Sequence, residues 1–441
     1  MGEGKKKGVD AILIAIFCLI ILAITQISIG HASGPQWPMF RHDLARTGAV
    51  DCAGPTTNSL LWTYTTGGGV TSSPAIEGDT VYVGSKDGNV YALDALTGRQ
   101  IWSYTTIPTK EVISSPAVAN GLVYVGANNT KVYALNATDG TMVWSYPTFF
   151  DVWSSPAVAN GYLYIGGLDT FMYALNATTG TLKWFQQLNV SMSSSPAVVG
   201  DTVYIAGVAG NPYPGNVTAL DAYTGAIKWS YQLGSFSGIY FSSPAVVNGI
   251  VYIGSFGGSV LALNATTTNP AGQLIWSYMT TLYYSVNVSP AVWNGIVYVG
   301  SQNYRAYALN ATNGNKIWDY LTGGPIWCSP AVSSNGIVYI GSDDNKTYAL
   351  NATTGTKLWD YQMGGNLHGS CVVASPGLAS AAIVYVGSAD GKLYAIGAKS
   401  VGGIRIPVDK FGILAPWIAL ASAVGIVSVS AAIYLKRRKK A

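Results

Sequence analysis

A four-part phrase recurs eight times between residues 60 and 396, and this repetition constrains the fold more than any other feature. One complete copy joins Ser114–Val118, Leu122–Gly126, Val132–Asn136 and Met142–Tyr146. Seven copies carry a Ser-Pro-Ala proline at intervals of 40 to 48 residues, at Pro74, Pro116, Pro156, Pro196, Pro244, Pro290 and Pro330. Repeats of this length with four strand-like pieces are typical of β-propeller blades. The sequence therefore predicts an all-β fold in which each copy forms one four-stranded blade.

The order of the pieces predicts which strand lies where in a blade. The Ser-Ser-Pro-Ala-Val run should be the innermost strand, because proline is tolerated at the first residue or at the edge of a strand. The two middle runs alternate with period two and are joined by short polar turns. The outermost strand should carry a tryptophan, and there are eight such residues: Trp62, Trp102, Trp144, Trp184, Trp229, Trp276, Trp318 and Trp359.

The two ends of the repeat array are complementary. The tryptophan run at 60–64 precedes every Ser-Pro-Ala run, and the last copy, at 384–396, has no tryptophan run after it. The spare N-terminal strand can complete the last blade and so remove exposed sheet edges. We therefore predict an eight-bladed ring closed by an N-terminal outer strand. A seven-bladed ring with a stray hairpin is the alternative.

The charge of the chain is concentrated at its ends. The formal net charge is +4, but eight of the 24 basic residues lie in two terminal runs, at 5–7 and 436–440. Once Glu3 and Asp10 are also set aside, 16 basic and 18 acidic residues remain, a net charge of −2 for the central part. Nucleic-acid binding needs a concentrated basic face, so this function is disfavoured.

Both ends of the chain carry membrane signals. Lysines at 5–7, an apolar stretch at 11–24 and the small-x-small site Gly30–Ala32 together predict a secretory signal peptide. An uncleaved N-terminal anchor is the alternative, because apolar character continues to Ile29. At the other end, residues 411–435 contain no charge and are long enough to span a bilayer. The basic run that follows predicts a cytoplasmic C-terminus.

These signals predict a single-pass protein of the cell membrane whose propeller is extracytoplasmic. The predicted organisation is a signal peptide at 1–32, a lead-in segment at 33–59, the propeller at 60–397, a linker at 398–410, a transmembrane helix at 411–435 and a basic cytoplasmic tail at 436–441.

Asn-x-Ser/Thr sites for N-glycosylation are numerous. They occur at Asn128, Asn136, Asn176, Asn189, Asn216, Asn264, Asn287, Asn310, Asn345 and Asn351. Each matters only in an exported domain, and we expect some of them to carry glycans. Five share one position of the repeat, where Asp94 and Asp221 stand in other blades. Asn and Asp at such a position cap a turn with the side chain, which is the alternative explanation for these five. Asn287 is followed by Ser-Pro, which hinders glycan transfer.

One spacing links the chain to a known family. The run Ala92–Trp102 resembles the tryptophan-docking motif of pyrroloquinoline-quinone (PQQ) dehydrogenase propellers, and the spacing recurs at 174–184, 219–229, 308–318 and 349–359. The opening run Trp37–Asp43 with Thr47-Gly48 resembles the lead-in of archaeal and bacterial PQQ-like repeat proteins. This resemblance implies that the tryptophans pack neighbouring blades together. Non-enzymatic relatives include the propeller subunit of the bacterial outer-membrane assembly machinery.

The resemblance also implies one enzymatic alternative. A PQQ dehydrogenase needs the quinone, a Ca²⁺ ion held by Glu, Asn and Asp oxygens, and a catalytic Asp; many add a disulfide of adjacent cysteines. This chain has no adjacent cysteines, and its glutamates are Glu3, Glu77 and Glu111 alone. The acidic run Asp343–Asn345 occupies the same polar turn as Lys86–Gly88, so we interpret it as a solvated turn and not as a metal site. We predict no cofactor and no catalytic residue.

Histidines and cysteines are too few to indicate a catalytic centre. Outside the predicted signal peptide the histidines are His42 and His368, and two cannot make a zinc site. The exported cysteines are Cys52, Cys328 and Cys371. Cys328 and Cys371 fall on the inner strands of neighbouring blades, at positions that we take as equivalent. They could form a disulfide or remain as two buried free thiols.

The residues just before the Ser-Ser-Pro elements could form a binding surface. They should lie at the mouth of the central channel: Thr71, Ile113, Trp153, Ser193, Phe241, Asn287, Trp327 and His368. Neighbouring loops add Phe149, Phe150, Tyr240, Tyr283 and Tyr284. Of these, the predicted ligand-binding residues are Trp153, Phe241, Asn287, Trp327, His368, Phe150 and Tyr284. Such aromatic side chains could stack on sugars or on a peptide side chain, or simply pack on one another.

We therefore predict a membrane-anchored, extracytoplasmic propeller without catalytic activity. It would bind a cell-envelope protein or a glycan, or act as a scaffold, through its loop face. A PQQ- and Ca²⁺-dependent dehydrogenase of alcohols or sugars is the alternative, and a structural surface-layer component is a third hypothesis.

Overall fold

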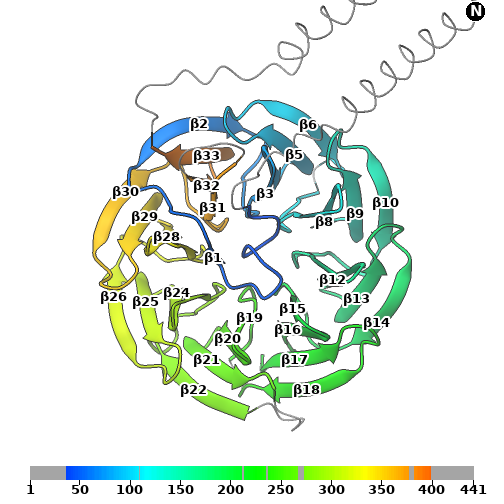
Figure 1. Ribbon diagram of the computed structural model, residues 1–441. Coiled ribbons are helices and arrows are strands. Elements are labelled where there is room, and N and C mark those ends of the chain that lie inside the picture. The colour runs from blue at the N-terminus through cyan, green and yellow to red at the C-terminus, as the bar shows by residue number, and fades with distance from the viewer. Residues whose placement is uncertain are drawn as a thin grey trace, which may run out of the picture. The chain divides into compact units, whose positions relative to one another are not determined.

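Eight four-stranded antiparallel sheets are arranged in a ring, as blades of a propeller (Figure 1). The computed structural model describes residues 36–108, 110–210, 213–234, 237–266, 273–376 and 382–398. The predicted eight-bladed all-β fold is confirmed, and the seven-bladed alternative is wrong. The signal peptide and the spanning segment lie outside the described residues. Within the described ranges no helix is long and apolar enough to cross a membrane.

Every blade has the same strand order from the axis outwards. The innermost strands are β3 (Ala75–Glu77), β7 (Ala117–Ala119), β11 (Ala157–Ala159), β15 (Ala197–Val199), β19 (Ala245–Val247), β23 (Ala291–Trp293), β27 (Ala331–Ser333) and β31 (Val372–Ala374). The second strands are β4 (Thr80–Gly84), β8 (Leu122–Ala127), β12 (Tyr162–Gly166), β16 (Thr202–Val208), β20 (Ile250–Gly254), β24 (Ile296–Gly300), β28 (Ile337–Ser342) and β32 (Ile383–Gly387). We number the blades 1 to 8 in this order.

The outer half of each blade contains the third strand and the tryptophan strand. The third strands are β5 (Asn89–Asp94), β9 (Lys131–Asn136), β13 (Phe171–Asn176), β17 (Gly215–Asp221), β21 (Ser259–Asn264), β25 (Arg305–Asn310), β29 (Lys346–Asn351) and β33 (Lys392–Gly397). The outermost strands are β6 (Gln100–Thr105), β10 (Met142–Pro147), β14 (Leu182–Gln187), β18 (Ile227–Gln232), β22 (Gln273–Met279), β26 (Lys316–Leu321), β30 (Lys357–Gln362) and β2 (Ser59–Thr65).

The ring closes as the sequence predicts. Strand β2, near the N-terminal end of the described chain, pairs antiparallel with β33 of the last copy and completes blade 8. Figure 1 shows β2 beside β33, next to the blade that contains β5 and β6. The first and last parts of the repeat array are therefore held together by a full strand pairing, which leaves no break between blades 8 and 1.

Local chemistry explains the turns and the direction of the tryptophans. Several turns between first and second strands are Asn-Gly pairs with positive φ at both residues, such as Asn120 (54°) and Gly121 (73°), which suits the twist of a tight hairpin. Each outermost strand has a one-residue register shift just before its tryptophan, as between Ala92 and Leu93 opposite β6. A bulge bends a strand and re-aims its side chains.

The tryptophans join each blade to the next. In all eight blades the indole Nε1 donates to a backbone carbonyl beyond the blade boundary, over 2.9 to 3.4 Å. A tyrosine of the second strand donates to the same carbonyl; Trp102 and Tyr82 of blade 1, for example, share the oxygen of Ala137. The turn that contains the acceptor also contains a glycine on which the indole ring packs. In the turn of Ala137 this is Gly140, where a Cβ would lie only 2.6 Å from the Trp102 ring.

The lead-in segment runs across the inside of the ring. Figure 1 shows it in dark blue at the centre, where β1 (Ala49–Val50) pairs parallel with β27. Its backbone carbonyls accept N–H groups from inner strands of successive blades, for example Pro38 from Val118 and Leu44 from Val198. Trp37 is 1% exposed. We call residues 36–58 the plug, because they lie across the axial channel at the end where the inner strands finish.

Candidate functional site

The residues before the Ser-Ser-Pro elements converge on the axis at the end opposite the plug. Side chains alternate in an extended chain, so every second residue shares a direction. In blade 1, Ser72 points back into its own blade, where its hydroxyl donates to the carbonyl of Gly84 over 2.8 Å. Thr71 and Ser73 on either side of it therefore face the axis. We call the eight equivalents of Thr71 the mouth ring: Thr71, Ile113, Trp153, Ser193, Phe241, Asn287, Trp327 and His368.

Beneath the mouth ring lies a closed circle of serines. The backbone N–H of each donates to the hydroxyl oxygen of the next, over 2.8 to 3.3 Å, and Ser370 donates back to Ser73. We call this set the serine ring: Ser73, Ser115, Ser155, Ser195, Ser243, Ser289, Ser329 and Ser370. Because each hydroxyl oxygen already accepts a bond, its proton is the group left for another acceptor.

Two arginines of the plug form the floor below the serine ring. Arg46 donates from Nε to the carbonyl of Pro196 and from Nη2 to those of Ser155 and Pro156. Arg41 donates to the carbonyls of Pro290 and Pro330. Burial lowers the pKa of both guanidinium groups to about 9, so they remain charged at neutral pH. Because the plug occupies this end of the channel, the mouth ring offers the approach to the axis.

Two aromatic groups occupy opposite parts of the mouth ring. The rings of Trp153 and Phe241 are stacked, with centroids 6.1 Å apart and planes 8° from parallel. Ser193, which lies between them in the ring, is small enough to let them meet. Phe241 is 42% exposed. This pair presents a flat aromatic surface at the mouth.

The second group is Trp327, His368 and Asp343. The ring centroids of Trp327 and His368 are 5.8 Å apart. His368 Nε2 lies 3.2 Å from a carboxylate oxygen of Asp343, which reaches the mouth from the turn after β28. Burial raises the pKa of Asp343 above its usual value, although His368 opposes the shift. The structure thus brings together a turn residue and two mouth residues that the sequence did not connect.

Three mouth-ring residues carry buried polar atoms that have no hydrogen-bond partner. These atoms are Trp153 Nε1, Asn287 Oδ1 and Thr71 Oγ1. Asn287 is only 6% exposed. Buried polar groups are normally paired with protein, water or a ligand, and leaving one unpaired costs about 1–3 kcal/mol. The mouth-ring residues therefore have hydrogen-bonding capacity that no protein group uses.

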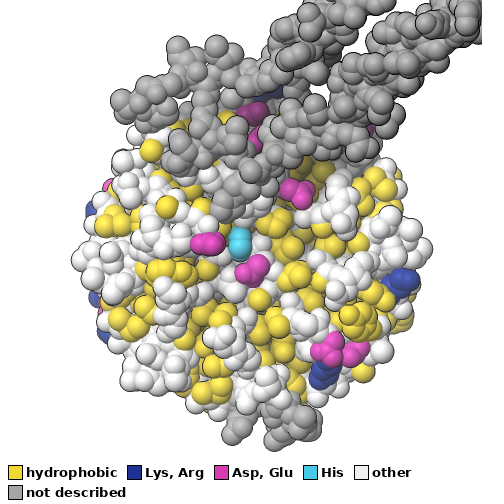
Figure 2. Space-filling model, in the orientation of Figure 1, with side chains coloured by type: hydrophobic (Ala, Val, Ile, Leu, Met, Phe, Trp, Pro, Cys, Tyr) yellow, Lys and Arg dark blue, Asp and Glu magenta, His cyan; other side chains and the backbone are white. Residues whose placement is uncertain are grey.

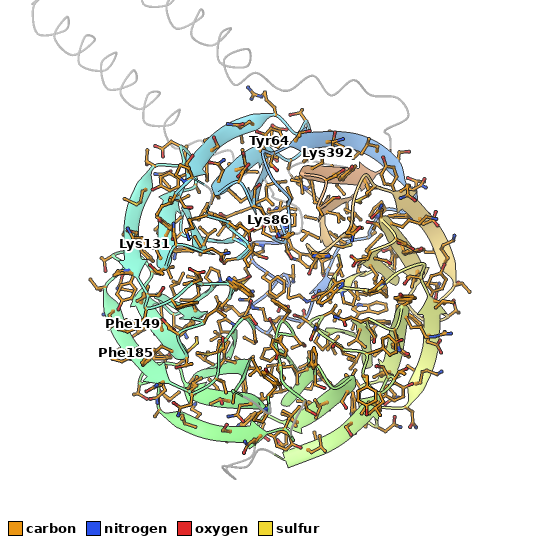
Figure 3. All side chains as sticks on the ribbon, turned by 180° about the vertical axis from the view of Figure 1, so that it is seen from behind. Tyr64, Lys86, Lys131, Phe149, Phe185 and Lys392 are labelled. Atoms are coloured by element: carbon orange, nitrogen blue, oxygen red, sulfur yellow. The ribbon has the colours of Figure 1, made fainter. Side chains whose placement is uncertain are left out.

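One of the predicted loop aromatics, Phe149, lies away from the axis. Phe149 is 75% exposed and packs on Phe171, which in turn contacts Phe185. Figure 3 labels Phe149 and Phe185 together at the outer edge of the ring, whereas Lys86 lies nearer its centre. Phe150 and Tyr284 are 56% and 48% exposed, and neither contacts a mouth-ring aromatic in the described part of the chain. That Phe150 and Tyr284 take part in ligand binding therefore stays a prediction from their positions in the loops.

The five glycosylation candidates that share one repeat position also cap turns. Asn176 is typical, since its Oδ1 accepts the N–H groups of Thr178 and Thr179 at 3.0 and 2.9 Å. Asn136, Asn264, Asn310 and Asn351 act in the same way. Capping uses the oxygen and leaves the nitrogen, so glycan attachment at these sites stays a prediction.

Cys52, Cys328 and Cys371, the cysteines within the described ranges, are free thiols, so the Cys328–Cys371 disulfide is not formed. The sequence led us to expect that Cys328 and Cys371 occupy equivalent positions, but they do not. Ser329 donates to Ser370 within the serine ring, so Cys328 precedes the ring residue of its blade whereas Cys371 follows it. The Cys328 thiol donates instead to the carbonyl of Gly369 over 3.0 Å.

The acidic side chains of the described residues are dispersed. The described residues contain no group of three His, Cys, Asp or Glu side chains placed to hold a metal ion. Asp343 pairs with His368, and Glu111 lies 3.8 Å from Lys86. Asp344 accepts the hydroxyl of Tyr348 at 2.5 Å. No adjacent cysteines are present.

The sequence reasoning missed the plug arginines and the serine ring. A signal for the arginines was present, because arginine is rare in this chain and two fall within six residues of the lead-in. The serine ring could have been inferred from the repeated second serine of the Ser-Ser-Pro element. On the face that Figure 2 shows, a histidine lies beside two acidic side chains near the centre, and the other charged side chains are scattered among hydrophobic and uncharged ones.

The fold and the repeated docking contacts define an eight-bladed propeller of PQQ-like repeats. Comparison with family models places the chain more narrowly: it belongs to the family described as outer membrane protein assembly factor BamB, whose model matches residues 43–147, 110–277 and 267–401. No curated protein sequence matches the chain significantly.

Solved structures of two kinds share the fold. BamB from Moraxella catarrhalis is 19% identical, with a TM-score of 0.64 over 78% of this chain and 99% of that one. A europium-containing methanol dehydrogenase is 16% identical, with a TM-score of 0.71 over 82% and 98%. Quinohemoprotein alcohol dehydrogenase from Comamonas testosteroni is 17% identical, with a TM-score of 0.71 over 84% and 82%. At these identities the likeness concerns the fold alone.

Proposed function

We propose that the chain is a non-catalytic binding module of the cell surface, which engages a protein or glycan through its mouth ring. The observation that carries the proposal is the mouth itself. It combines a stacked aromatic pair, of which Phe241 is exposed, with three unpaired buried polar atoms, while the plug occupies the other end of the channel. Unpaired polar groups and aromatic faces at one concave place are what a recognition site needs.

The proposal includes attachment to the membrane, with the propeller on the outer side. It rests on the uncharged segment at 411–435 and the basic run after it, together with the N-terminal signal. A protease added to intact cells should then digest the propeller and spare the C-terminal tail. Digestion of the tail alone would reverse the orientation.

Binding is tested with the full-length protein in detergent against cell-envelope proteins and glycans. The variants Trp153→Ala and Trp327→Ala should weaken whatever partner is found, because each removes one aromatic group of the mouth. Binding that survives both changes would place the site elsewhere.

The alternative function is that of a dehydrogenase, and it can be tested with the same full-length protein. The protein is incubated with PQQ and Ca²⁺, and dye reduction is followed with alcohols and sugars. We expect no turnover, because the described residues offer no group of three His, Cys, Asp or Glu side chains that could hold a metal ion. Turnover above the level of heat-denatured protein would overturn the non-catalytic proposal.

A further inference from the structure

We infer that the mouth ring binds a neutral sugar, held as a single ring stacked on the Trp153–Phe241 pair. This inference rests on the proposed function and specifies its ligand class. It starts from three atoms, Trp153 Nε1, Asn287 Oδ1 and Thr71 Oγ1, which are buried at the mouth without a hydrogen-bond partner.

The hydrogen-bonding character of these atoms points to hydroxyl groups. The indole N–H only donates, the amide oxygen only accepts, and the threonine hydroxyl does both. A hydroxyl of a ligand can serve any of them, because it is both donor and acceptor. A hydrocarbon or aromatic peptide side chain would leave all three unpaired, at a cost for each group.

The aromatic pair supplies the other half of sugar recognition. The ring planes of Trp153 and Phe241 are only 8° from parallel, so the faces of the two rings point in nearly the same direction. A pyranose has an apolar C–H face that packs on such a surface and a rim of hydroxyls that remain free to bond. Phe241 keeps 42% of its surface exposed, so part of the pair remains accessible to a ligand.

The charges around the mouth favour a neutral ligand. Among the charged groups on the turns around it, Asp343 lies 3.2 Å from His368 and Lys86 lies 3.8 Å from Glu111. The plug guanidinium groups below the serine ring already donate to backbone carbonyls. Both guanidinium groups are buried and hydrogen-bonded to the backbone, so neither is placed to pair with an ionic ligand at the mouth.

The serine ring extends the site inward. Its eight hydroxyl oxygens accept backbone N–H groups, which leaves their protons for a ligand oxygen or for water above the plug. A sugar stacked at the mouth would direct one edge toward this circle of donors. The site would thus bind the end of a glycan and not an internal stretch, because the channel is closed below.

The test uses an array of neutral mono- and oligosaccharides with the full-length protein, followed by calorimetric titration of each hit. We expect binding that falls at least tenfold in Trp153→Ala and in Asn287→Ala. If a variant of a more buried residue fails to fold, Phe241→Ala replaces it in the test, because Phe241 is half-exposed, and the same loss of affinity is expected. The matched control is Phe185→Ala, an aromatic that is 53% exposed on the outer rim, and its affinity should be unchanged.

Monodeoxy sugars separate stacking from hydrogen bonding. Removal of the hydroxyl that pairs with Asn287 should weaken binding to the wild type but make no difference to Asn287→Ala. Absence of any neutral sugar ligand, or equal loss in Phe185→Ala, would overturn the inference. If a protein partner is lost in Trp153→Ala while no sugar binds, the sugar inference fails and the proposed binding function stands.

Discussion

The indole Nε1 of Trp359 donates a hydrogen bond of 3.2 Å to the backbone carbonyl of Pro55, across an interval of 304 residues. In the other blades this acceptor belongs to the turn after the third strand of the next blade, as with Ala137 for Trp102. Blade 8 has no such turn, because its outer strand β2 comes from the other end of the repeat array. The plug supplies the missing carbonyl, and Tyr339 donates to it as well, over 3.0 Å.

Replacement of Trp359 by Ala should therefore destabilise the protein as much as a tryptophan change within the ring. We expect a loss of about 3–5 kcal/mol in the free energy of unfolding, which is typical for removal of a buried tryptophan. Urea unfolding followed by circular dichroism measures it. Leu358→Ala, one residue away and 47% exposed, is the control and should change stability by less than about 1 kcal/mol. A loss no greater than the control's would mean that Pro55 does not replace the docking turn.

The glycines beneath the tryptophans allow a matched comparison. Gly98 and Gly121 both have positive φ, 70° and 73°, so alanine at either suffers the same backbone strain. A Cβ on Gly98 would also lie 2.6 Å from the Trp62 ring, whereas nothing lies within 4 Å of one on Gly121. We expect Gly121→Ala to cost about 1–2 kcal/mol and Gly98→Ala clearly more. Equal losses in thermal unfolding would show that the docking contact is not tight.

The repeat could predict the fold because each copy contains the residues that determine the strands, turns and docking contacts of a blade. The Trp102 and Ser115 positions recur in the same order in successive copies, and the Asn120–Gly121 turn recurs in several of them, so each copy is expected to have the same geometry. Even the closure by β2 followed from counting which strand type was left over at each end. Periodicity alone was sufficient for these features.

The plug could not be predicted in this way, because it occurs once. Nothing periodic marks residues 36–58, and Arg41, His42 and Arg46 adopt positive φ values of 63°, 77° and 60°, which sequence patterns do not reveal for non-glycine residues. The mouth was predicted only in part. The ring positions followed from the repeat, but the contact of Asp343 with His368 depends on how the turn of one blade meets the start of the next.

Arg46 should be essential for stability although it is not one of the predicted binding residues. Its guanidinium group donates to carbonyls of blades 3 and 4, and a buried charge needs such partners. Arg46→Met keeps much of the volume but leaves those carbonyls without their donor, so we expect a loss of about 3 kcal/mol or more. Thermal unfolding measures it, with the exposed Arg99→Met as control. Similar thermal unfolding midpoints for the two variants would show that the hydrogen bonds of Arg46 do not stabilise the ring.

The turn that places Arg46 gives the fold a dependence on pH. Asp43 accepts the backbone N–H of Thr47 at 2.9 Å and its hydroxyl at 2.5 Å, and His42 Nδ1 lies 3.5 Å away. Burial works to raise the pKa of Asp43, but the hydrogen bonds from His42 and Thr47 outweigh it, so the pKa lies below its usual value of 3.8.

A carboxyl group whose pKa is lowered by folding stabilises the native state when it is ionised. The contribution of Asp43 is thus fully present above its unfolded pKa, near 3.8, and is lost as the pH falls through the lower folded value. Asp43→Asn should unfold at a lower temperature than the wild type at neutral pH, and the difference should shrink below about pH 4. Asp51→Asn, an exposed neighbour, should match the wild type at both pH values. A constant difference across this range would show that the charge of Asp43 does not hold the turn.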